Sequence, residues 1–125
     1  YGHNGYPDWP AGQLRTSITD LSRILSTYLS EGEIGGDNVI NPSVIEILSP
    51  MIPDQGFHTW RLQGDGNGDL LYSHTGSDIG IRTIMMLNRI NSKGVIVLTN
   101  GEAEVQSIAN EIYKSIDSPL IKNND

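Results

Sequence analysis

The stretch that decides the fold is LLYSHTGSDIGIRTIMMLNRINSKGVIVLTN, residues 70–100. It holds three runs expected to form strands, Leu70–Thr75, Ile81–Asn88 and Val95–Thr99, joined by short polar segments. Connections this short join antiparallel neighbours. The last two runs are almost continuously hydrophobic, which is typical of strands buried on both faces. The stretch therefore predicts an antiparallel sheet.

A fourth strand is expected over Phe57–Gln63, joined to the stretch by a hairpin turn at residues 64–68. The turn residues Asp65-x-Asn67-x-Asp69 imitate the start of a calcium loop. Such a loop also needs Gly at its sixth position and Glu at its twelfth, where this chain has Leu70 and Gly76. Because Asp-Gly and Asn-Gly are strong hairpin formers, the turn is favoured over the metal site.

Helices are expected outside the sheet. Apolar residues at helical spacing predict a helix over residues 18–29, with Ser17 as its N-cap. A polar loop over residues 33–40 leads to a short helix over roughly 42–48, and a last helix covers residues 102–116. The predicted fold class is α+β, with an antiparallel sheet of about four strands and the C-terminal helix packed on it.

Composition excludes several classes of function. With 125 residues, the chain is one domain at most, or part of a larger one. Its formal charge of −7 and its scattered basic residues argue against nucleic acid and anionic membrane surfaces as partners. The absence of cysteine excludes disulfides and thiolate metal sites, and no apolar stretch approaches the ~20 residues of a membrane span. The three histidines have no spacing that suggests a shared metal, so we expect neither a metal nor a cofactor.

The segment His74-Thr75-Gly76-Ser77 is the candidate functional site, because a polar group with a glycine after a strand suits a backbone edge that a substrate approaches closely. A structural interpretation stays open, since strand-end His, Thr and Gly often only turn a chain. The twelve serines include neither Gly-x-Ser-x-Gly nor Ser-x-x-Lys, so no complete nucleophilic site is expected from local motifs.

Four segments, in this order and spacing, resemble the serine β-lactamase and penicillin-binding-protein superfamily. The most similar branch is the class C β-lactamase-like group, with its D-aminopeptidases, carboxypeptidases and esterases. The segments are Pro10–Leu21 (P-x-G-x-L-x-T-S-x-x-D-L), Ile47–Pro50, His74-Thr75-Gly76 with Gly80, and Gly94–Asn100. The likeness runs over almost the whole chain.

The resemblance assigns roles to the candidate residues. The family builds its site from Ser-x-x-Lys, Tyr-x-Asn and a strand motif, Lys-Thr-Gly or His-x-Gly, at a sheet edge, and only the strand motif is found here. It implies that His74 orients and polarises the substrate and that the Thr75 hydroxyl meets its carboxylate or carbonyl. Gly76 would let substrate pair with the strand edge, and the backbone N–H of Ser77 would be one of two oxyanion donors.

The resemblance also implies that residues 1–125 are the C-terminal fragment of a single β-lactamase-like domain, an α/β sandwich whose missing N-terminal part carries the nucleophile. The parent protein would be a serine hydrolase that acts through an acyl-enzyme on a β-lactam, a D-amino-acid peptide or an ester. The isolated chain would be inactive, its partner would be the missing part of the domain, and its location would be periplasmic or extracellular. The alternatives are a non-catalytic binding or regulatory domain with the same fold and a structural interaction domain.

Overall fold

A computed structural model describes residues 12, 14–46, 61–64, 68 and 70–116 of the chain. The elements, in order, are α1 (Ile18–Leu29), β1 (Glu33–Ile34), β2 (Asp37–Asn38), α2 (Pro42–Glu46), β3 (Arg61–Gly64), β4 (Leu70–Asp78), β5 (Ile81–Asn88), β6 (Lys93–Thr99) and α3 (Val105–Ser115). The predicted calcium-like turn and the first part of the predicted strand 57–63 lie outside the described residues.

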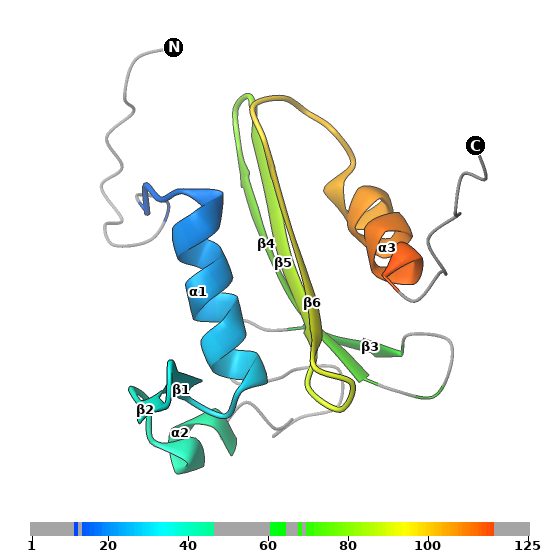
Figure 1. Cartoon of the computed structure of the whole chain (residues 1–125). Coiled ribbons are helices and arrows are strands. Elements are labelled where there is room, and N and C mark those ends of the chain that lie inside the picture. Colours follow the sequence, from blue (N-terminus) through cyan, green and yellow to red (C-terminus); the bar gives the residue numbers. More distant parts are fainter. Residues whose placement is uncertain (1–11, 13, 47–60, 65–67, 69, 117–125) are drawn as a thin grey trace, which may run out of the picture.

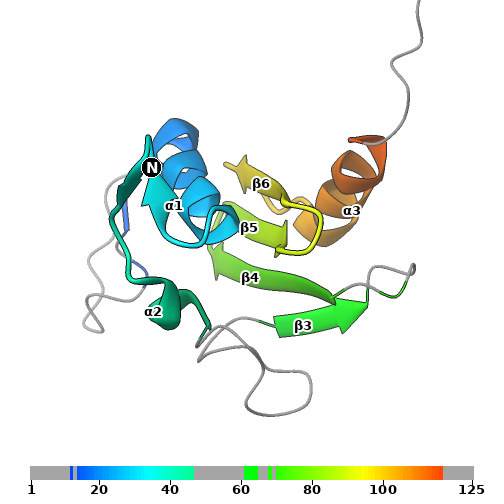
Figure 2. The same ribbon diagram turned by 60° about the horizontal axis from the view of Figure 1, so that its bottom comes forward.

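The core of the fold is a four-stranded antiparallel sheet with the order β3-β4-β5-β6. Consecutive strands are neighbours throughout, as the short connections predicted. The predicted α+β class is confirmed, with about four strands and the C-terminal helix packed on the sheet. Helices α1 and α3 lie on opposite faces and cover β5 and β6 (Figures 1 and 2).

Each face of the sheet has its own cluster of apolar side chains. The α3 face holds Leu71, Ile84, Met86, Val95, Val97, Val105, Ala109 and Tyr113. The α1 face holds Leu25, Tyr72 and Leu87, with Tyr28, Leu29, Leu62, Met85 and Ile96 packed against them. Because successive side chains of a strand point to opposite faces, a strand with side chains in both clusters needs apolar residues at nearly every position. This is why β5 and β6 have continuous rather than alternating hydrophobic sequences.

Helix α1 begins where its capping residue predicts. The Ser17 hydroxyl accepts a hydrogen bond from the backbone N–H of Asp20 (3.1 Å), which satisfies one of the free N–H groups of the first turn. The segment that follows differs from the predicted polar loop, because β1 and β2 form a two-stranded hairpin there. Gly35 and Gly36 make its turn with φ of 63° and 95°. Strands of two exposed residues are too short to show a hydrophobic pattern, so they could not be predicted from the sequence.

Helix α3 begins at Val105, three residues later than residue 102 predicted from the sequence. The cause is Glu104, whose carboxylate accepts hydrogen bonds from the backbone N–H groups of Gln106 (3.1 Å) and Ser107 (2.7 Å) and so caps the helix. Hydrogen bonds from the side chain and backbone of Ser107 hold the pKa of the Glu104 carboxyl below its usual value. Glu102 is left in the connection before the helix, where it makes other contacts.

Close packing of α1 on β6 depends on Gly94. A Cβ atom at this position would lie 2.7 Å from Cδ2 and 2.9 Å from Cδ1 of Leu25, which is 7% exposed and anchors the α1-face cluster. The methyl groups of Leu25 therefore occupy the space that any larger residue needs. The helix and strand approach each other closely because position 94 has no side chain.

We expect Gly94→Ala to lower the free energy of unfolding by about 1–3 kcal/mol, because Leu25 must move or leave its rotamer. Urea denaturation of the purified chain measures this change. Gly101→Ala is the matched control, since a Cβ there meets nothing within 4 Å. Equal stabilities for the two variants would contradict the role given to Gly94.

Candidate functional site

The candidate segment His74–Ser77 lies inside β4 and not after its end. The sequence predicted a strand that stops at Thr75, whereas β4 pairs with β5 from Tyr72↔Leu87 as far as Asp78↔Ile81. The chain turns only at Ile79–Gly80, where Gly80 takes a φ of 74° that suits glycine. The interpretation of His74, Thr75 and Gly76 as residues that turn the chain is therefore wrong.

The outer side of β4 is paired along only part of its length. Strand β3 pairs with Leu70–Ser73, from Gly64↔Leu70 to Arg61↔Ser73. Within the described residues, β4 has no neighbouring strand on that side from His74 onward, and Figure 1 shows β3 beside only one end of it. Among the described residues, the candidate segment therefore begins where the pairing of β4 with β3 ends.

The turn determines which backbone groups of β4 face away from β5. A two-residue connection closes on a hydrogen-bonded pair, which here is Asp78 and Ile81. Hydrogen-bonded and non-hydrogen-bonded pairs alternate along antiparallel strands, so Gly76↔Thr83 is hydrogen-bonded and Ser77↔Arg82 is not. The N–H and C=O groups of Thr75 and Ser77 therefore point away from β5, toward the side of β4 on which β3 lies.

The side chains of the segment are divided between the two faces of the sheet. Tyr72 belongs to the α1-face cluster, so His74 and position 76 lie on that face by the alternation of the strand. Leu71 belongs to the α3-face cluster, so Thr75 and Ser77 lie on the opposite face. His74, Thr75 and Ser77 are exposed. The four predicted residues thus share a backbone edge, while their side chains do not converge on one point.

Gly76 has a structural requirement of its own. A Cβ atom there would lie 2.5 Å from Oγ1 of Thr83, its cross-strand partner on β5. The Thr83 hydroxyl occupies the place of the missing side chain, so a larger residue at position 76 would require the Thr83 side chain to move, even without a ligand. This contact is compatible with close approach of a substrate to the same backbone, which the resemblance implies.

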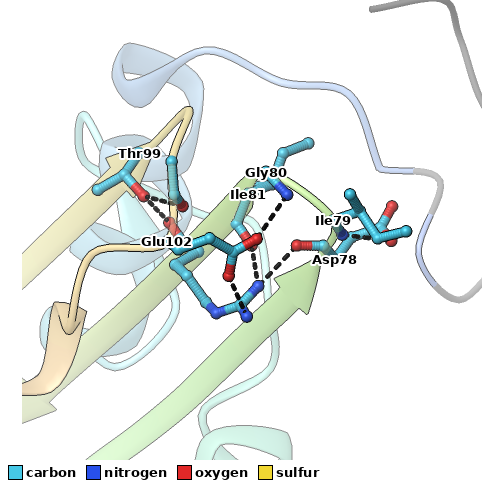
Figure 3. A network of polar contacts seen from close by, with 8 residues as sticks. Asp78, Ile79, Gly80, Ile81, Thr99 and Glu102 are labelled. Carbon is cyan, nitrogen blue, oxygen red and sulfur yellow. Dashed lines mark hydrogen bonds and ion pairs between the residues drawn. The ribbon is translucent and has the colours of Figure 1, made fainter.

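A polar network beside the segment was not predicted from the sequence (Figure 3). The Glu102 carboxylate accepts a hydrogen bond from Gly80 N–H (2.8 Å) through Oε1 and forms an ion pair with the Arg82 guanidinium through Oε2. Glu102 lies 22 residues from Gly80 in sequence, so no local motif indicates the contact. The late start of α3 leaves this residue free to reach the turn.

The described part of the chain also has a hollow, but the hollow lies away from the candidate segment. It has a volume of about 330 Å³ and is lined by Leu29, Glu31, Leu70, Tyr72, Arg89 and Ile90. Its β4 residues, Leu70 and Tyr72, belong to the part of the strand that pairs with β3. The candidate segment therefore does not line this hollow.

No group of three His, Asp or Glu residues in the described ranges is placed to hold a metal ion. Among the same residues, no helix has both the length and the apolar character needed to cross a membrane.

Comparisons with protein-family models, with curated proteins and with solved structures found no match to the chain.

We expect Gly76→Ala to destabilise the chain by about 1–3 kcal/mol, because the new methyl group overlaps the Thr83 hydroxyl. Thr83→Ala removes that hydroxyl, so the same change in a Thr83→Ala background should cost less than about 0.5 kcal/mol. Denaturant unfolding of the four proteins of this double-mutant cycle measures the coupling. An equal cost in both backgrounds would show that the Thr83 contact does not explain the glycine.

Proposed function

We propose that this chain is the C-terminal part of a serine hydrolase domain of the β-lactamase, D-Ala-D-Ala carboxypeptidase or esterase type. Its proposed role is to supply the substrate-binding strand and one oxyanion donor. The observation that carries the proposal is the outer side of β4, which no described strand pairs beyond Ser73. There the backbone N–H of Ser77 points away from β5 within a His-Thr-Gly-Ser sequence. The resemblance assigns the same N–H to the oxyanion.

The proposed reaction needs groups from two parts of the parent protein. A serine outside this chain attacks the substrate carbonyl carbon while a general base takes the hydroxyl proton. Negative charge develops on the carbonyl oxygen, where the N–H groups of Ser77 and of the nucleophile stabilise it. The leaving group departs with a proton, and water then hydrolyses the acyl-serine ester to release the acid and free the serine.

The other proposed roles follow from positions along the same edge. A substrate peptide or its mimic would extend β4 by pairing with the outward N–H and C=O groups of Thr75 and Ser77. His74, exposed on the α1 face, would orient and polarise the bound substrate, and the Thr75 hydroxyl would bind its carboxylate or carbonyl. Gly76, which follows Thr75 and is half-buried, would keep this position of the strand free of a side chain.

The second candidate function is a non-catalytic binding domain, and a specific observation favours it as well. An open strand edge can hold an extended peptide through backbone hydrogen bonds without any chemistry. The chain contains no Ser-x-x-Lys and no Tyr-x-Asn sequence of its own. The two functions therefore differ in whether a covalent acyl-enzyme forms.

The natural protein that contains this chain should be labelled covalently by a fluorescent penicillin or an activated ester, and mass spectrometry should locate the label on a serine outside residues 1–125. His74→Ala should reduce kcat/KM by between about 10- and 100-fold, which corresponds to about 1.4–2.7 kcal/mol of lost transition-state stabilisation. Arg23→Ala, which removes an exposed cation from α1, is the control that should keep full activity.

The isolated chain should hydrolyse neither nitrocefin nor p-nitrophenyl esters. Turnover by the pure chain that disappears on mutation of one of its own serines would overturn the proposal. Reversible binding of peptide without acylation of the natural protein would support the binding domain instead. An unchanged rate in His74→Ala would remove that residue from the site.

A further inference from the structure

The turn between β4 and β5 is held from outside by two charged side chains. Glu102, in the connection before α3, accepts a hydrogen bond from the Gly80 N–H (2.8 Å) and pairs with Arg82. Arg82, on β5, donates through Nη1 to the carbonyl oxygens of Asp78 (2.6 Å) and Ile81 (2.9 Å). Together, these two side chains bind the backbone on both sides of the turn (Figure 3).

A third side chain ties this network to the rest of the sheet. The Thr99 hydroxyl, at the end of β6, lies within hydrogen-bond distance of the carbonyl oxygens of Arg82 (3.0 Å) and Gly101 (3.2 Å). Thr99 is also the cross-strand partner of Arg82. The turn is therefore connected to the end of β6 and to the start of the connection that leads to α3.

The network lies next to the proposed oxyanion donor. Arg82 is the cross-strand partner of Ser77. Its shortest hydrogen bond goes to the carbonyl oxygen of Asp78, the residue that follows Ser77 on β4. Because Ser77↔Arg82 is a non-hydrogen-bonded pair, no backbone hydrogen bond from β5 holds Ser77 itself. The direction of the Ser77 N–H is therefore determined by the residues before and after it on β4. The residue after it, Asp78, is held by this network.

We infer that Arg82 and Glu102 are positioning residues for the Ser77 N–H, an inference that rests on the proposed serine hydrolase function. The network fixes the end of β4 so that this donor keeps its direction when charge develops on the substrate. Donors that are already oriented stabilise a transition state without the cost of reorganisation. Neither side chain touches the substrate in this scheme, so both act through the backbone of β4.

The exposure of the ion pair argues that its main effect is local. The Arg82 and Glu102 side chains are 33% and 57% exposed, and ion pairs this accessible to water contribute little to global stability. A residue that only stabilises the fold would change the unfolding transition and the activity together. A positioning residue should instead change the chemical step with little effect on unfolding or on substrate binding.

The test uses the natural protein with Glu102→Ala, Glu102→Gln and Arg82→Ala. We expect the acylation rate constant to fall between about 10- and 100-fold in the two alanine variants, with substrate binding before acylation changed by less than about twofold. Glu102→Gln keeps one acceptor oxygen and should lose less than Glu102→Ala. The acyl-enzyme carbonyl band in the infrared spectrum should move to higher frequency in the alanine variants, because weaker hydrogen bonds polarise the carbonyl less.

Glu111→Ala is the matched control for Glu102, and Arg23→Ala is the matched control for Arg82. Each control removes from a helix surface an exposed charge of the same sign as the residue it is matched to. If the unmutated protein is acylated but acylation rates and carbonyl bands are unchanged in all three variants, the positioning role is overturned and the proposed function is not. A parallel loss of binding, stability and rate would also overturn it, because that pattern indicates a purely structural role. No acylation of the unmutated protein would overturn the proposed function and, with it, this inference.

Discussion

Burial of β5 on both faces is the constraint on which the rest of the structure depends. Ile84, Met86 and Leu87 are 1%, 0% and 0% exposed, and they serve two separate apolar clusters. Burial on both faces requires one helix on each side of the sheet, which α1 and α3 provide. Gly94 then has to be small because α1 packs directly on β6 beside this strand. Burial of apolar side chains thus determines how β5 and β6 pack between the two helices, and the outer strands are positioned by pairing with them.

The candidate site lies where this burial ends. Along β4, Leu71, Tyr72 and Ser73 are buried, whereas His74 and Thr75 are exposed. The strand still continues through the polar segment because β5 pairs with it up to the turn, and because Arg82 and Glu102 bind the turn from outside. A polar strand edge held by a rigid neighbour can present backbone donors in a fixed direction. This property supports the proposed oxyanion donor, and it would equally serve an extended peptide ligand.

Much of the fold could be predicted from the sequence, because the decisive signals are local. The continuous apolar runs of β5 and β6 and the Ser17 cap of α1 indicate their elements correctly. The end of β4 was predicted too early, because its last residues are polar and remain in the strand through pairing with β5. The Glu102–Gly80 contact spans 22 residues and depends on where α3 begins, so no sequence pattern indicates it. The residue types of the candidate segment can be recognised in the sequence. The direction of its backbone groups follows only from the register in which β4 pairs with β5.

Amide hydrogen exchange along β4 of the 125-residue chain tests the central claim most directly, because it measures which N–H groups point away from β5. After correction for intrinsic rates, Gly76 and Asp78 should exchange slowly, since their N–H groups bond to β5. Thr75 and Ser77 should exchange at least about tenfold faster, since their N–H groups point outward. Equal protection of all four residues, or protection of Thr75 and Ser77 instead of Gly76 and Asp78, would contradict an outward-pointing, accessible Ser77 N–H.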